Sequence, residues 1–312
     1  DELILTWAAD SGSGRPRRPS PFIAEALDLP AATPAMPDRE ARLQRLAALE
    51  GSPPAQAASA RRVAPDGTLT LSFSALDDYL GCPARYRLRH VLGVPVPPHH
   101  ALAYGTALHA AVAAFGQQRQ KGRTMSEQEL LDVFASHWSP EGFLSREHEE
   151  ARFDAGREAL RRFHAAQLAE GAPVPAGVEE GFSFELDGVR LRGRFDRVDE
   201  TAAGVVITDF KSSDVRDPLK AKARARDSLQ LAIYALAHEA ATGTLPAAVQ
   251  LHFLDSGLVG RVAPEPARLA KARQRIARAA EGIGAGEFAA TPDQLGCGYC
   301  PFRDICPDSA AR

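Results

Sequence analysis

The chain has 312 residues, of which 45% are hydrophobic and 25% are charged, which is enough apolar material for one large or two ordinary domains. Its formal net charge of -3 argues against a generally basic surface, but not against local basic patches. We find no signal peptide and no long apolar run, and therefore expect a cytoplasmic protein with no membrane partner.

The N-terminal part differs in composition from the rest. Residues 8–68 are dominated by Gly, Pro, Ala and Ser, with Phe22 as their only aromatic residue, so we expect a flexible linker there. Within it, residues 39–50 repeat apolar side chains at helical spacing and predict one short helix. The segment 1–7 precedes this linker, and residues 69–312 form the predicted folded domain.

Residues 69–312 show helical and strand patterns in alternation. Their order favours an α/β fold, in which a mixed sheet is flanked by helices. No Gly-rich phosphate loop is present, so we do not expect this chain to bind ATP. The predicted elements are helices over 99–116 and 147–170, three strands within 181–210, a helix over 228–239, a strand over 248–254 and a helix over 265–282.

Two neighbouring strands, over 189–198 and 204–210, carry the most informative residues. A short polar turn over 199–203 would make them antiparallel and bring Asp196 close to Asp209. Two carboxylates and the Phe210 carbonyl are suitable ligands for Mg²⁺. Lys211 would emerge on the same face as Asp209, beside a scissile phosphate. A lone D-x-K is common by chance, so a surface ion pair on a hairpin is the alternative.

The four cysteines form a second group. Three of them lie close together near the C-terminus with C-x₂-C-x₅-C spacing, and the fourth lies far upstream. This arrangement suits a shared metal better than two disulfides, and soft thiolates select either Zn²⁺ or an iron–sulfur cluster. The spacing favours the cluster only modestly, because four cysteines serve both. The residues are Cys82, Cys297, Cys300 and Cys306.

Taken in order, these motifs resemble the RecB-like branch of the PD-(D/E)xK nucleases, in particular the iron–sulfur nuclease domain of AddB-type and UvrD-like helicase–nucleases. The resemblance extends from about Leu69 to Pro307. Any one motif is weak evidence, whereas the ordered set is strong. The set comprises a first helix with LSFSAL over 71–76 and CPARY over 82–86, GTALH over 105–109, VE over 178–179, GRFDRVD over 193–199, DFKSS over 209–213, QLAIY over 230–234 and the C-terminal cysteines.

The resemblance implies a restriction-endonuclease-like core in which a [4Fe–4S] cluster joins the N- and C-terminal parts of the domain. It also implies that His109 helps to bind the catalytic metal, for which an imidazole favours Mn²⁺ over Mg²⁺. Without it, a core histidine would be the better interpretation. Gln230 and Tyr234 lie one helical turn apart and either orient Lys211, contact DNA or pack in the core. Glu179 is either a second-metal or supporting group or a surface charge.

The expected activity is Mg²⁺- or Mn²⁺-dependent cleavage of single-stranded or end-exposed DNA, as an exonuclease or endonuclease in DNA end processing and recombinational repair. Basic stripes over 215–226 and 267–278 could contact phosphates or be solvated helix faces. Residues 1–7 resemble a strand of UvrD-like motors, so we expect a helicase in cis or as a separate subunit. The alternatives are a DNA-binding module that has lost cleavage and a zinc-stabilised interaction domain.

Overall fold

The computed structural model describes residues 68–311. The predicted motor segment, nearly all of the predicted linker and its short helix lie outside the described residues. Within them, no helix is both long enough and apolar enough to span a membrane.

Six strands form one mixed sheet. The sequence predicts a mixed sheet and four of these strands, but not the strands Leu69–Ser72 and Leu258–Val262. The sheet has the order β1-β3-β4-β5-β6, and β2 pairs with β3 beside this path. β1 is parallel to β3 and β4 is parallel to β5, whereas the other neighbours are antiparallel. The strands are β1 (Leu69–Ser72), β2 (Gly177–Leu186), β3 (Val189–Thr201), β4 (Gly204–Lys211), β5 (Ala248–Phe253) and β6 (Leu258–Val262).

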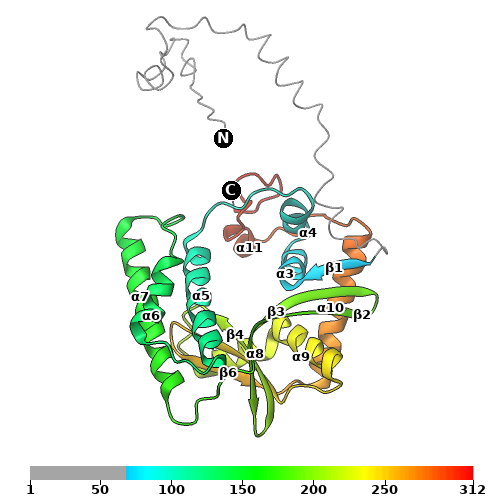
Figure 1. The fold of residues 1–312 in the computed structure, drawn as a ribbon. Coiled ribbons are helices and arrows are strands. Elements are labelled where there is room, and N and C mark those ends of the chain that lie inside the picture. Colours follow the sequence, from blue (N-terminus) through cyan, green and yellow to red (C-terminus); the bar gives the residue numbers. More distant parts are fainter. Residues whose placement is uncertain (1–67, 312) are drawn as a thin grey trace, which may run out of the picture. The chain divides into compact units, whose positions relative to one another are not determined.

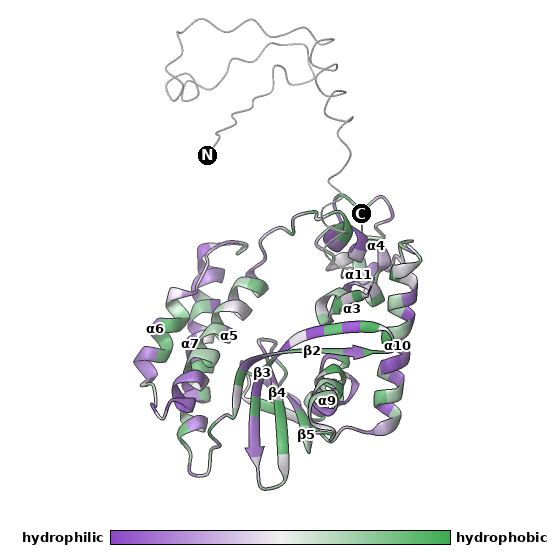
Figure 2. Ribbon diagram, turned by 45° about the vertical axis from the view of Figure 1, so that its right-hand side comes forward, coloured by the Kyte–Doolittle hydropathy of each residue, from purple (hydrophilic) through white to green (hydrophobic). Residues whose placement is uncertain are grey.

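Helices cover both faces of the sheet (Figure 1). One core joins the sheet to α3, α9 and α10, and a second core lies among α5, α6 and α7 and reaches the sheet through Phe210. β4 and α9 are largely hydrophobic, as Figure 2 shows. The helices are α3 (Phe73–Gly81), α4 (Pro83–Tyr86), the π-helix η1 (Arg87–Val91), α5 (His100–Gln120), α6 (Glu127–Ser136), α7 (Arg146–Leu168), α8 (Pro218–Asp227), α9 (Leu229–Thr242), α10 (Pro266–Gly284) and α11 (Gln294–Gly298).

The first and last described segments lie side by side (Figure 1). The Tyr79 hydroxyl on α3 donates a hydrogen bond to the Glu287 carbonyl at 2.9 Å. The rings of Tyr86 and Phe288 stack with their centroids 5.9 Å apart. Thr291 adds a hydrogen bond of 3.3 Å to the carbonyl of Gly81, directly before the first cysteine. The beginning and the end of the domain are therefore packed into one unit.

Two local predictions are wrong. The turn predicted over 199–203 is shorter, because β3 continues to Thr201, and Asp199 is buried in an ion pair with Arg197 at 2.8 Å. Asp199 is therefore part of β3, and its buried charge is compensated by Arg197. The first helix implied over 71–76 starts only at Phe73, after Ser72 has ended β1 and capped α3 with its hydroxyl.

Candidate active site

β3 pairs with two different strands along the same edge, and Asp196 lies where the pairing changes from β1 to β4. Along one edge, β3 pairs with β1 over 189–192 and with β4 over 197–201, which leaves the segment 193–196 between them. Asp196 occupies the end of this gap, and its carboxylate Oδ2 accepts a hydrogen bond of 2.8 Å from the Phe210 amide on β4. The predicted antiparallel neighbours are thus confirmed, and the split between β1 and β4 makes room for a side chain that holds the two strands together.

The second acid, Asp209, closes a ring of three hydrogen bonds and one ion pair with three other predicted residues. Lys211 Nζ lies 2.8 Å from Asp209 Oδ2 and donates a hydrogen bond of 2.8 Å to Gln230 Oε1. Gln230 Nε2 donates to the Tyr234 hydroxyl at 3.1 Å, and this hydroxyl donates to Asp209 Oδ1 at 3.3 Å. Asp209 is 1% exposed, so its charge depends on these partners. The ring fixes where the ammonium group of Lys211 can lie.

A different trio offers a metal site. Ligand atoms of His109, Glu179 and Asp196 all lie within 4.8 Å of one another. His109 Nδ1 is 3.5 Å from Asp196 Oδ2. Asp209, which the sequence predicts to be a metal ligand, is not in this trio. Glu179, whose role the sequence leaves open, belongs to it. The fourth predicted ligand is the Phe210 carbonyl. The Phe210 amide donates a hydrogen bond to Asp196 Oδ2, and a backbone hydrogen bond with Phe210 tends to raise the pKa of His109.

Glu179 reaches the site through an irregular backbone. It is a non-glycine residue with φ 53°, in the left-handed region, although it lies within β2. The hairpin register brackets it opposite Asp196, because Val178 faces Arg197 and Glu180 faces Phe195. Arg194 holds its carboxylate with an ion pair of 2.9 Å. Such backbone strain persists only where surrounding contacts maintain it, and it is concentrated at functional sites.

The charges of the site are poorly compensated. Burial, followed by the charge of Asp209, raises the pKa of Asp196 to about 8. Burial, with the nearby cation of Lys211, lowers the pKa of His109, so its imidazole is neutral and can act as a ligand. Carboxylate oxygens with one imidazole nitrogen are donors for a hard or borderline divalent cation. The donor set therefore fits Mg²⁺ or Mn²⁺, whose charge would relieve the repulsion between the carboxylates.

α5 forms one wall of the groove in front of this trio. The groove has a volume of about 410 Å³ and includes Leu102, Gly105 and Thr106 of α5 beside the trio. Gly105 lies one helical turn before His109, and a Cβ atom there would be 3.2 Å from the Ser212 hydroxyl, just after β4. The absence of a side chain at Gly105 lets α5 approach the end of β4 closely enough for His109 to reach Asp196.

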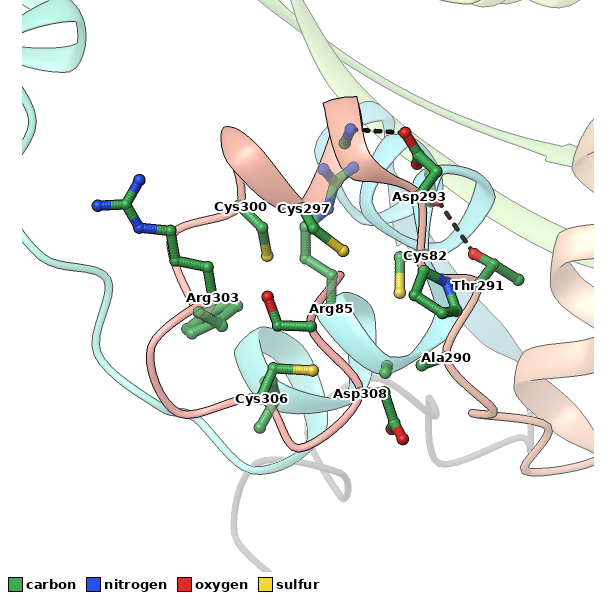
Figure 3. A pocket seen from close by; sticks show the side chains of 17 residues that line it. Cys82, Arg85, Ala290, Thr291, Asp293, Cys297, Cys300, Arg303, Cys306 and Asp308 are labelled. Atoms are coloured by element: carbon green, nitrogen blue, oxygen red, sulfur yellow. Dashed lines mark hydrogen bonds between the residues drawn. The ribbon is translucent and has the colours of Figure 1, made fainter. Parts of the chain in front are cut away.

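The four cysteines line a separate cavity of about 40 Å³. They come from α11, from the residues after it and from the junction between α3 and α4, and their sulfur atoms turn toward the same space (Figure 3). Burial tends to raise the Cys82 pKa, but hydrogen bonds from residues including Thr291 and Arg85 lower it, whereas burial raises the Cys300 pKa. In the described residues, no three cysteine sulfurs lie within 4.8 Å of one another.

Several known proteins are similar to this chain. Gene 69 protein of Mycobacterium phage D29 is 27% identical over 268 residues, which cover 76% of this chain and 96% of that protein. Gene 69 protein of Mycobacterium phage L5 is 25% identical over 287 residues, which cover 76% of this chain and 95% of that protein. A crystal structure from Eubacterium rectale, provisionally named an exonuclease, has a TM-score of 0.43 at 14% identity and covers 71% of this chain and 83% of its own.

The family profile of the PD-(D/E)XK nuclease superfamily matches residues 70–307. The match includes both the sheet with its acidic residues and the segment that carries the cysteines. The chain therefore belongs to the PD-(D/E)XK nuclease superfamily.

Proposed function

We propose that the chain is a metal-dependent deoxyribonuclease that hydrolyses phosphodiester bonds in single-stranded or end-exposed DNA. The observation that carries this proposal is the hydrogen-bonded ring of Asp209, Lys211, Gln230 and Tyr234 beside the trio of His109, Glu179 and Asp196. The ring holds the Lys211 ammonium close enough to act on His109 and Asp196, and the trio supplies ligands for a second positive charge. Together, these two positive charges fit a phosphodiester, which is negatively charged and gains further negative charge as its bond to the leaving oxygen breaks.

Each residue contributes a distinct part of the chemistry. His109, Glu179 and Asp196 would hold a divalent cation, which polarises a phosphate oxygen and offsets the charge that develops during hydrolysis. Asp209 lies next to this group and holds the Lys211 ammonium in an ion pair of 2.8 Å. Because Gln230 also holds Lys211, the ammonium is positioned before the substrate arrives, so little reorganisation is needed during the reaction.

A cleavage assay with end-labelled single-stranded DNA and Mg²⁺ or Mn²⁺ tests the proposal. Asp209→Asn and Lys211→Met should each reduce cleavage by a factor of at least about 100, a typical effect of removing a charge-stabilising group. Asp214→Asn is the matched control, because this carboxylate is exposed and lies only three residues beyond Lys211. Near-parental cleavage by either site variant contradicts the assignment. Metal-independent DNA binding by a parent that does not cleave would instead favour the non-cleaving module.

We further propose that the cysteines bind a [4Fe–4S] cluster. A tetrahedral zinc site with Zn–S bonds of about 2.3 Å needs sulfur atoms about 3.8 Å apart. The four sulfurs surround one cavity, but no three of them in the described residues lie within 4.8 Å of one another. The choice of a cluster over a single zinc ion rests on the resemblance of the ordered motifs, which end in these cysteines. A cluster would cross-link segments separated by some 200 residues and remove their loop-closure entropy from the unfolded state.

Protein purified without oxygen should therefore be brown and contain iron and acid-labile sulfide. Cys300→Ser should lose both and unfold at a lower temperature. Ser309→Ala is the matched control, because it alters the same cavity without removing a thiolate. A colourless protein with one zinc ion and no iron would replace the cluster with a zinc site.

The proposal also includes a helicase partner, in cis or as a subunit, for DNA end processing and recombinational repair. Its support is the likeness of residues 1–7 to a strand of UvrD-like motors, together with the order of the nuclease motifs. Size fractionation of the native protein tests this part. ATP-dependent strand separation should co-elute with the nuclease, and a nuclease peak without it contradicts the partner.

A further inference from the structure

A further concave surface, whose lining includes four cationic side chains, lies at the end of α9 that carries Gln230. It is a cavity of about 190 Å³ between the end of α8, the first turn of α9 and the first half of α10. We call it the basic groove. Its lining contains four cations and one carboxylate, namely Arg226, Arg268, Lys271, Arg275 and Asp227.

The cations of the basic groove are only partly neutralised. Arg226 and Arg268 share Asp227, at 3.1 and 3.0 Å, and Arg268 also pairs with Glu265 at 2.9 Å. Lys271 and Arg275 are exposed, and within the described part of the chain neither forms an ion pair. These two like charges lie four residues apart on α10, a spacing that destabilises a helix. Their repulsion therefore does not stabilise the helix. An anion bound in the groove would offset this repulsion.

The groove is connected to the catalytic lysine through the first turn of α9. Leu229 and Ala272 form an apolar floor and are 8% and 4% exposed. The residue after Leu229 is Gln230, which binds Lys211 Nζ at 2.8 Å. Arg224 on α8 reaches the Ser213 hydroxyl at 3.5 Å, two residues beyond Lys211. Cationic side chains thus continue from the end of β4 toward the groove.

We propose that the basic groove binds backbone phosphates of the substrate strand next to the bond that is cut. This inference rests on the proposed nuclease function and adds the path of the strand. An apolar floor with cations on its rim fits a sugar–phosphate chain, which presents a charge at each nucleotide and apolar sugar and base surfaces between them. The contacts are independent of sequence and give affinity and register.

The variant Lys271→Ser/Arg275→Ser tests the inference in the full-length chain. Binding of a single-stranded oligonucleotide is measured in chelator, so that no cleavage takes place. Two lost phosphate contacts should lower the slope of log affinity against log salt by about 1.4, since each contact on a single strand contributes about 0.7. The ratio of parent to variant affinity should then fall about sevenfold between about 50 mM and about 200 mM salt. Hydrolysis of bis(4-nitrophenyl) phosphate, which is too small to reach the groove, should be unchanged.

The control variant Arg87→Ser/Lys121→Ser removes the same charge from two exposed positions outside the basic groove and outside both basic stripes. It should keep the parental salt slope. An unchanged slope in the groove variant overturns the inference, and so does an equal loss in both variants, which would reflect net charge alone. If the groove variant lowers the salt slope but the parent cleaves no DNA with Mg²⁺ or Mn²⁺, the nuclease proposal is wrong. Phosphate binding in the basic groove is then still supported.

Discussion

Replacing Asp196 by Asn should change how the stability of the protein depends on pH. Burial and the charge of Asp209 raise the pKa of Asp196 from 3.8 to about 8, so the folded protein retains a proton that the unfolded chain releases. Between these values the free energy of unfolding falls as pH rises, and the contribution is lost as pH passes through the folded pKa. Asn keeps the size of the side chain and an acceptor for the Phe210 amide, but it has no proton to lose.

The magnitude follows from this one proton. Its linkage slope is about 1.4 kcal/mol per pH unit, so the parent should lose about 2 kcal/mol between about pH 6 and about pH 8. For a domain of this size, that loss corresponds to about 4 to 8 °C in the unfolding temperature. His109 is present in the parent and in the variant, and burial, with Lys211, lowers its pKa from its ordinary value.

Thermal unfolding of the parent and of Asp196→Asn, in chelator at several pH values, measures the difference directly. The contributions of groups that titrate in both proteins cancel in the difference between the two curves. The remaining difference is due to the proton on Asp196. Added Mn²⁺ should stabilise the parent more at pH 8 than at pH 6, because binding must displace that proton. Parallel curves for the two proteins across this range would refute the assigned charge state and the crowding of carboxylates on which it depends.

Three further outcomes are expected. Gly105→Val should reduce cleavage at least about tenfold, because its side chain would push α5 away from Ser212 and move His109; parental cleavage at saturating Mn²⁺ contradicts this. Tyr234→Phe should lower the free energy of unfolding by about 1 kcal/mol, measured by urea titration, because Asp209 loses a buried hydrogen bond. Removal of residues 1–62 should leave cleavage and the unfolding temperature intact, since no site residue lies there; a large drop in either refutes the predicted linker.

The strands that carry Asp196 and Asp209 could be predicted because their signals are local. Each is a run of β-branched and aromatic residues, and a short connection makes them antiparallel. β1 was missed because it has only four residues, and its partner, β3, lies more than 100 residues later. α6 has a local signal that the prediction did not use, the capping box formed by Ser126 and Glu129.

The role of Glu179 depends on register, which composition does not reveal. The signal was present in the two-residue turn Asp187-Gly188, because both residues have positive φ values, 50° and 81°, as a tight hairpin requires. Counting back from this turn sets Glu179 opposite Asp196. The separation of Asp209 from the metal trio has no such signal, since it depends on hydrogen bonds from α9, a different element of the fold.

The contacts between Tyr79 and Glu287 and between Tyr86 and Phe288 have a consequence for how the protein is made. A ribosome releases the partners of α3 and α4 only after more than 190 further residues have been added. Until then the nascent chain exposes the aromatic surface of these helices, which is a liability for aggregation. Completion of this domain therefore depends on the segment that carries Glu287 and Phe288, and a message truncated before Phe288 would yield a chain that cannot close its domain.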